Sequence, residues 1–195
     1  MSGTVHTSVE MANLALAHLK EAPIRDFDYS SVASRWFKNH YAAHLDAYLA
    51  QHDWDFATAL VKLPAESVSP PFRWQYQYQK PADCLRIPQQ TFEGNPDGNV
   101  IAFEVIGEKI LTDHEAPFPL RYIRRVTRET EFPPLFVHGF SQFLAASAAH
   151  VITGKNSRAE ALRQAALETF QQAGSHDATQ GTPLPMVDLE IITDR

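Results

Sequence analysis

The residues best suited to chemistry are a serine that follows a glycine by two positions and two histidines four residues apart. Gly139 and Ser141 resemble the start of a nucleophile elbow, but Phe143 stands where the second glycine is required. His40 and His44 would share one helix face and could hold a metal ion, yet the glutamate of a metalloprotease motif is missing between them. Packed or solvated helical side chains explain both patterns better. We therefore predict no catalytic residue, no cofactor and no metal ion.

Acidic pairs and a single cysteine are the other residues that could form a metal site, a disulfide or an active site. Asp26 with Asp28 and Asp53 with Asp55 each flank an aromatic residue at a helix boundary, so we interpret them as helix caps rather than as cation ligands. Cys84 is the only cysteine, which excludes an intramolecular disulfide and a cysteine-based zinc site. A glycoside hydrolase would need two facing carboxylates, and the sequence does not identify such a pair.

Composition limits the class of partner. The net charge of −6 and the pI near 5.8 argue against a general binder of DNA or of anionic membranes, which needs a basic excess. A hydrophobic fraction of 44% is ample for a folded core. The N-terminus lacks the pattern of a secretory signal, and there is no run of about 18 apolar residues. We expect no membrane association and synthesis in the cytoplasm.

Four arginines form the one concentrated basic segment of the chain. They are Arg121, Arg124, Arg125 and Arg128. On a strand, the first and third would lie on one face and the second and fourth on the other, so a single DNA-reading stripe is not supported. We predict that they make ion pairs between subunits or contact an acidic neighbour. A plain solvated strand remains the alternative.

Apolar periodicity divides the chain into helical and extended stretches. Residues recur at three- and four-residue spacing over about 8–20, 31–50, 133–154 and 157–173, which predicts four amphipathic helices. Between the second and third helices, strand formers, Pro and Gly predominate. Strands are predicted at 74–79, where Trp and Tyr alternate with Gln, in a hairpin over 100–112, and at 120–126. Residues 64–71 read as an extended, proline-rich segment.

These stretches predict an α+β fold. Segments 1–57 and 132–180 would form a four-helix bundle, and segment 58–131 would be a small antiparallel β subdomain inserted into it. Residues 181–195 begin with prolines and read as an extended C-terminal arm.

The arm has a two-sided pattern. Val187, Leu189 and Ile191 alternate with Asp188, Glu190 and Ile192. One face of such a segment can pack while its main chain pairs with a partner strand. We predict that Val187, Leu189, Ile191 and Ile192 dock on a partner protein. A frayed terminus is the alternative.

Four motifs, taken in order, are similar to a known family. They are 15–24, 52–57, 80–86 and the aromatic helix that begins at Pro133 and ends in 145–149. In this order they resemble the tail tubular protein A family, the head-to-tail adaptors of short-tailed bacteriophages, over nearly the whole chain. The proline-rich stretch around 64–71 and the C-terminal arm depart from the family pattern.

The resemblance implies a structural virion protein rather than an enzyme. Family members look like subunits of a dodecameric ring that joins the portal protein at the capsid vertex to a tail nozzle similar to tail tubular protein B. Double-stranded DNA would pass through the channel without sequence-specific binding. The protein would be assembled in the host cytoplasm and reside in the neck of the virion tail. Two alternatives are a tail-associated cell-envelope hydrolase and a host-encoded scaffold with no phage role.

Overall fold

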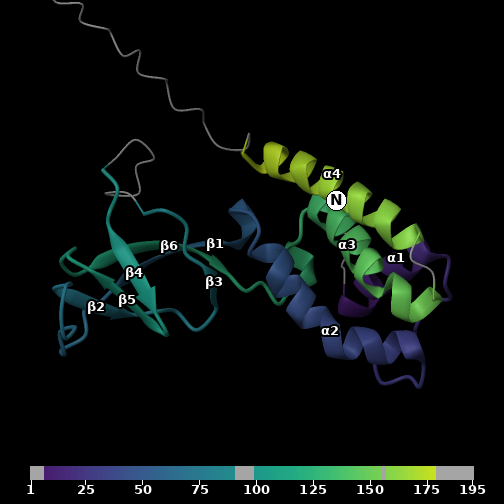
Figure 1. Cartoon of the computed structure of the whole chain (residues 1–195), viewed down its shortest axis with the longest axis horizontal. Helices are drawn as coiled ribbons and strands as arrows, with labels where there is room; N and C mark the ends of the chain where they lie inside the picture. Colours follow the sequence, from purple (N-terminus) through teal and green to yellow (C-terminus); the bar gives the residue numbers. More distant parts are fainter. Residues whose placement is uncertain (1–6, 91–98, 155–156, 179–195) are drawn as a thin grey trace, which may run out of the picture.

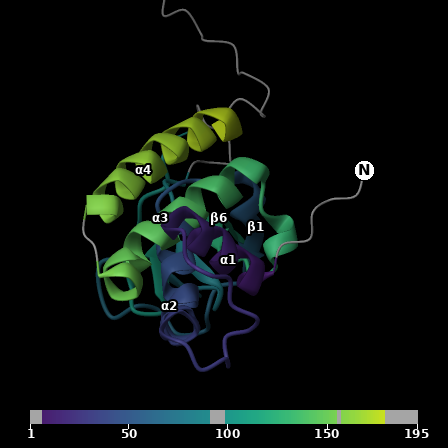
Figure 2. The same ribbon diagram turned by 90° about the vertical axis from the view of Figure 1, so that its right-hand side faces the viewer.

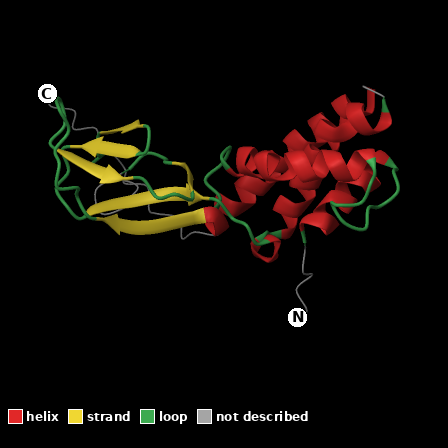
Figure 3. Ribbon diagram, turned by 90° about the horizontal axis from the view of Figure 1, so that it is seen from below, coloured by secondary structure: helices red, strands yellow, loops and turns green. Residues whose placement is uncertain are grey.

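The helices and strands separate into two lobes of an elongated molecule. The structure, a computed structural model, describes residues 7–90, 99–154 and 157–178. Figure 1 shows one helical lobe and one β lobe joined end to end, and Figure 3 shows the same division from below. With four helices and two small antiparallel sheets, the described chain has the α+β fold that the sequence predicts.

The first two helices begin at hydroxyl caps. Helix α1 (Ser8–Leu19) starts with a capping box, in which the Thr7 hydroxyl accepts from the Glu10 amide and the Glu10 carboxylate accepts from the Thr7 amide. It ends at Lys20, which takes a left-handed conformation with φ of 61°. Helix α2 (Val32–Leu49) is capped by the Ser31 hydroxyl, which accepts from the Ser34 amide at 3.0 Å.

Helix α3 (Pro134–Thr153) is the central element of the helical lobe. It lies between α4 (Ser157–Ala178) on one side and α1 and α2 on the other (Figure 2). By length and composition α3 is apolar enough to cross a membrane, but 61% of the apolar 18-residue stretch within it is buried inside the protein. It is therefore placed as the core helix of a bundle. It ends at Gly154, where φ is 67°.

The β lobe consists of two three-stranded antiparallel sheets. Sheet A has the order β1 (Thr58–Leu63), β6 (Phe118–Arg124), β3 (Cys84–Arg86). Sheet B has the order β2 (Tyr76–Gln79), β5 (Lys109–Thr112), β4 (Phe103–Ile106). Strands β4 and β5 form the predicted hairpin, and Gly107 supplies the positive φ of 59° that its two-residue turn requires.

Other predicted boundaries need correction. The tyrosine strand starts at Tyr76 rather than Trp74, and β6 starts and ends two residues before the predicted strand. Strands β1 and β3 were not predicted, because neither has a turn signal or clear alternation within its few residues. Helix α4 continues through Gly174 to Ala178, past the predicted end at 173.

Each lobe has its own hydrophobic core, and β6 reaches both. Phe118, Leu120 and Tyr122 pack in the core of the β lobe. Ile123, which points to the opposite face of the strand, packs in the helical core, as does Val126 just beyond. A continuous strand therefore ties the two lobes together.

The centre of the helical core is a cluster of aromatic rings contributed by α2, α3, α4 and the chain entering the β lobe. Its members include Tyr48, Trp54, Phe136, Phe140 and Phe170. Their ring centroids lie between 5.2 and 6.1 Å apart in these contacts, the range of favourable aromatic pairs. The aromatic residues of the sequence thus serve packing first.

Candidate functional site

An apolar groove, here called the tip groove, lies on the β lobe and has a volume of about 510 Å³. Its lining residues come from strands of sheet B and from residues 70–74. Figure 1 shows that these strands lie at the end of the molecule away from the helices. It is lined by Pro70, Pro71, Phe72, Arg73, Trp74, Gln77, Glu104, Ile106, Lys109 and Leu111. Phe72 is 79% exposed and Ile106 55% exposed. An exposed apolar patch with a polar rim is typical of a protein-binding surface.

Polar contacts fix one wall of the tip groove. The Glu104 carboxylate accepts from Trp74 Nε1 at 3.0 Å and pairs with the Arg73 guanidinium at 3.3 Å. The Arg73 guanidinium also lies 4.9 Å from the centre of the Trp74 ring, within cation–π range. These contacts hold the indole in place before a partner arrives, which lowers the entropy cost of binding.

The tip groove does not supply the carboxylate pair of a glycoside hydrolase. Among the described residues that line it, Glu104 is the only acidic one. Asp83 lies elsewhere, at the edge of sheet A, where its carboxylate accepts a hydrogen bond from the Tyr122 hydroxyl at 3.1 Å. Burial, together with this carboxylate, raises the pKa of Tyr122 to about 12.

Two of the four clustered arginines join the lobes to each other. Arg125 makes a bidentate ion pair with Asp46 of α2, with Nε–Oδ1 at 2.8 Å and Nη2–Oδ2 at 2.6 Å, and this contact raises the pKa of Arg125. Arg124 donates to the carbonyl of Phe56 and pairs with Glu131. Both arginines have partners within the chain, where they stabilise the junction.

The other two arginines remain available at the surface. Arg128 is largely exposed and lies 3.6 Å from Glu131. Arg121 is exposed on β6, and its guanidinium has no carboxylate partner among the described residues. Because β6 ends at Arg124, Arg125 and Arg128 lie beyond the strand, and the predicted end of the strand at residue 126 is wrong.

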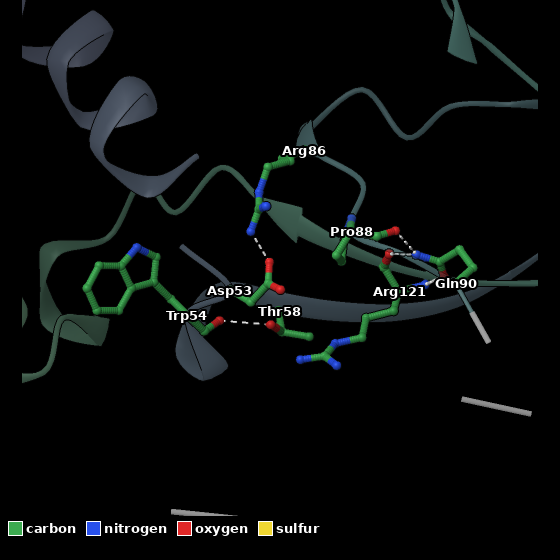
Figure 4. A network of polar contacts seen from close by, with 7 residues as sticks. All are labelled: Asp53, Trp54, Thr58, Arg86, Pro88, Gln90 and Arg121. Carbon is green, nitrogen blue, oxygen red and sulfur yellow. Dashed lines mark hydrogen bonds and ion pairs between the residues drawn. The ribbon is translucent and has the colours of Figure 1, made fainter. Parts of the chain in front are cut away.

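A buried glutamine holds the main chain at Arg121. The side chain of Gln90 accepts from the Arg121 amide and donates to the Arg121 carbonyl, both at 2.8 Å, and it also donates to the Pro88 carbonyl. Figure 4 shows the Arg121 guanidinium directed away from this network. Gln90 therefore fixes the main chain of β6 at Arg121, while the charged guanidinium of Arg121 points away from these contacts.

The junction of the lobes has a second ion pair, between Asp53 and Arg86 of β3 (Figure 4). Next to it, the Thr58 hydroxyl donates to the Trp54 carbonyl at 2.8 Å. The N-cap of α2 is Ser31 and that of the short helical turn at 55–57 is Trp54, so the predicted capping role is wrong for Asp28 and Asp53. Asp28 pairs instead with Lys38 at 2.6 Å.

The histidine pair is engaged in helix packing. The side-chain Nδ1 of His44 lies 2.9 Å from the main-chain carbonyl oxygen of His40, one turn earlier in α2. Both rings pack against Trp36, with centroids 5.1 and 5.2 Å away. Within residues 7–90, 99–154 and 157–178, no group of three His, Cys, Asp or Glu side chains is placed to hold a metal ion.

Ser141 has a histidine neighbour that the sequence did not indicate. Its hydroxyl lies 3.2 Å from Nε2 of His18 on α1, a contact between helices distant in sequence. The Ser141 hydroxyl also donates to the His138 carbonyl at 2.8 Å, within the same helix. Ser141 is only 2% exposed, so it lies in the packed interior rather than at the surface. The pair therefore links α1 to α3.

The predicted docking residues of the arm, Val187, Leu189, Ile191 and Ile192, lie outside the described residues. The tip groove was not predicted, because its walls come from segments about 30 residues apart that only the folded sheet brings together. The sequence feature that could have indicated the groove is Phe72, a large apolar residue directly after two prolines. No protein-family model matches this chain, and no curated protein matches it significantly in sequence.

Proposed function

We propose that this chain is a subunit of a ring adaptor that joins the portal at the capsid vertex of a short-tailed bacteriophage to the tail nozzle. The ring would be a dodecamer and would surround a channel for double-stranded DNA. The proposal rests on the order of the sequence motifs and on one structural observation. That observation is the exposed apolar tip groove at the far end of a lobe that is firmly tied to a helical body.

The two-lobed shape suits a subunit with several neighbours. A ring subunit needs two different lateral faces, so that one heterologous contact repeats until the ring closes. The helical lobe offers such faces, while the β lobe extends away from it (Figure 3). Of the clustered arginines, Arg121 and Arg128 supply charges for lateral contacts or for the channel wall. Arg124 and Arg125 keep the lobes aligned.

The tip groove would serve as the longitudinal contact, with the portal or the nozzle. Aromatic anchors in preformed pockets carry much of the free energy of protein–protein binding. Phe72 and Trp74 are side chains of this kind, and Glu104 holds Trp74 in position. Loss of Phe72 should weaken partner binding without affecting the core, because its side chain is mostly exposed.

The test is to mix the purified full-length chain with the portal and nozzle proteins encoded by the same genome. We expect electron micrographs to show a ring on the portal. Phe72→Asp should lower the affinity for one of the two partners at least tenfold. Tyr29→Asp, at an aromatic residue that is also exposed but lies outside the tip groove, is the matched control. The proposal fails if neither partner binds the wild-type chain.

A further inference from the structure

Strand β1 is an unprotected sheet edge. It pairs with β6 on one side only, and its other side meets no strand in the part of the chain that the structure describes. Exposed edges are usually blunted by proline, bulges or several charges, because their free main-chain groups pair readily with another strand. Here six regularly paired residues include Leu60, which is 80% exposed.

The two faces of this edge differ in chemistry. Leu60 lies opposite Arg121 of β6, so their side chains share one face, and Lys62 lies two residues farther along the same face. Lys62 and Arg121 have no acidic partner among the described residues. On the other face, Ala59 and Leu63 pack against the core of the β lobe, with Val61 partly exposed between them. A complementary strand would be apolar on one face and acidic on the other.

The C-terminal arm has this pattern. Val187, Leu189 and Ile191 would fall on one face of a strand, with Asp188 and Glu190 on the opposite face. Because the period of side chains along a strand is two, apolar residues placed beside Val61 put both carboxylates on the side of Lys62 and Arg121. Charge and hydrophobicity agree in one register.

We infer that residues 187–192 of a second copy of this chain add to the free edge of β1. The inference rests on the proposed ring, because the ring supplies a neighbouring copy at high local concentration. Each subunit then offers one arm and one edge, a heterologous contact that repeats around the ring. Main-chain hydrogen bonds give affinity, and the basic face selects the acidic arm.

Photo-crosslinking tests this contact directly. A benzoylphenylalanine at position 60 is placed in ¹⁵N-labelled full-length protein, which is mixed with unlabelled protein, and the adducts are mapped by mass spectrometry. The sample is examined both as rings on the portal and as concentrated free protein. We expect adducts between the labelled position 60 and unlabelled residues 182–195. Adducts only within one labelled chain, or only to other segments, would overturn the inference.

Charge reversal provides an independent measurement. Lys62→Glu with Arg121→Glu, or Asp188→Lys with Glu190→Lys, should lower the crosslink yield at least fivefold. Mixing the two altered proteins should restore it, since the charges are complementary again. Arg35→Glu, at an exposed arginine of α2, is the control and should leave the yield unchanged. Equal losses with the control, or no rescue, would contradict the assigned face.

The outcomes separate this inference from the proposed function. Rings on the portal without the crosslink would leave the adaptor standing and refute the β1 contact. A crosslink between copies in free protein that does not bind the portal would support the contact and refute the adaptor.

Discussion

A glycine in the middle of α3 offers a sharp test of the helical core. A Cβ atom at Gly139 would lie 2.4 Å from the hydroxyl oxygen of Tyr48, about 1 Å short of an ordinary contact at 3.4 Å. Tyr48 is 2% exposed and surrounded by aromatic rings, so it cannot move away easily. Among the described residues, no group makes a hydrogen bond with its buried hydroxyl. The same oxygen therefore carries a desolvation cost and blocks a larger residue in α3.

These facts predict a strong coupling between two substitutions. Gly139→Ala alone adds overpacking, which costs about 2–3 kcal/mol, against a gain of about 1 kcal/mol in helix propensity. The net loss should be about 1–2 kcal/mol. Tyr48→Phe alone should stabilise by about 1 kcal/mol, since it removes an unpaired buried hydroxyl. In the Tyr48→Phe background the next contacts are Thr169 Cγ2 at 3.3 Å and the ring carbon Cζ at 3.6 Å. There Gly139→Ala should be stabilising by up to about 1 kcal/mol.

Urea unfolding of the four proteins in this double-mutant cycle measures the coupling, which we expect to be about 2–3 kcal/mol. In thermal scans, 1 kcal/mol corresponds to about 2–4 °C in Tm for a chain of this size. Gly154→Ala is a useful comparison, because nothing lies within 4 Å of its Cβ and only its φ of 67° is strained. Additive effects of the two core substitutions would refute the assigned contact.

Three further predictions concern other parts of the molecule. Burial, together with the Asp83 carboxylate, raises the pKa of Tyr122 to about 12 in the folded protein, above its ordinary value of 10.0. The stability that its neutral hydroxyl contributes is therefore complete below pH 10 and is lost as the pH rises toward 12. The urea midpoint should therefore fall less steeply with pH between pH 8 and 11 for Tyr122→Phe than for the wild type. The same slope against pH in both proteins would contradict this. Asp46→Asn should cost about 1 kcal/mol or less, because the ion pair with Arg125 is partly exposed. The difference from wild type should shrink in 0.5 M salt, and a salt-independent loss would point to packing instead. Glu104→Gln keeps an acceptor for the Trp74 indole, so ring formation on the portal should stay within about twofold of wild type. Cell-envelope hydrolysis by the wild type that this change abolishes would favour the hydrolase over the adaptor.

The helices were predictable because their ends depend on local chemistry. The capping residues Thr7 and Ser31, and the left-handed glycine at Gly154, act through neighbours only a few residues away. Helix α4 shows where local signals fail. Gly174 reads as a stop, but it lies within the helix, where a Cβ would come within 3.1 Å of the His52 ring. A tertiary contact selects glycine there.

The sites were less predictable than the helices for a related reason. The carboxylates of Asp53 and Glu104 are paired with Arg86 and with Trp74, partners that are about 30 residues away in sequence. Strand pairing brings these groups together, and their types alone do not indicate it. The predicted strand at 120–126 extends too far, because the chain leaves β6 after Arg124 to reach the helical core.

The chain enters and leaves the β lobe at adjacent points. Strands β1 and β6 pair along their length, and the first residue of one, Thr58, lies opposite Ile123 near the end of the other. Directly paired residues have Cα atoms only about 4.5–5.5 Å apart, so a short turn could close the gap if everything between them were removed. We therefore expect that this lobe can be exchanged as a unit while the helical body keeps its fold. Related chains would then keep the helices and vary the β lobe that they carry.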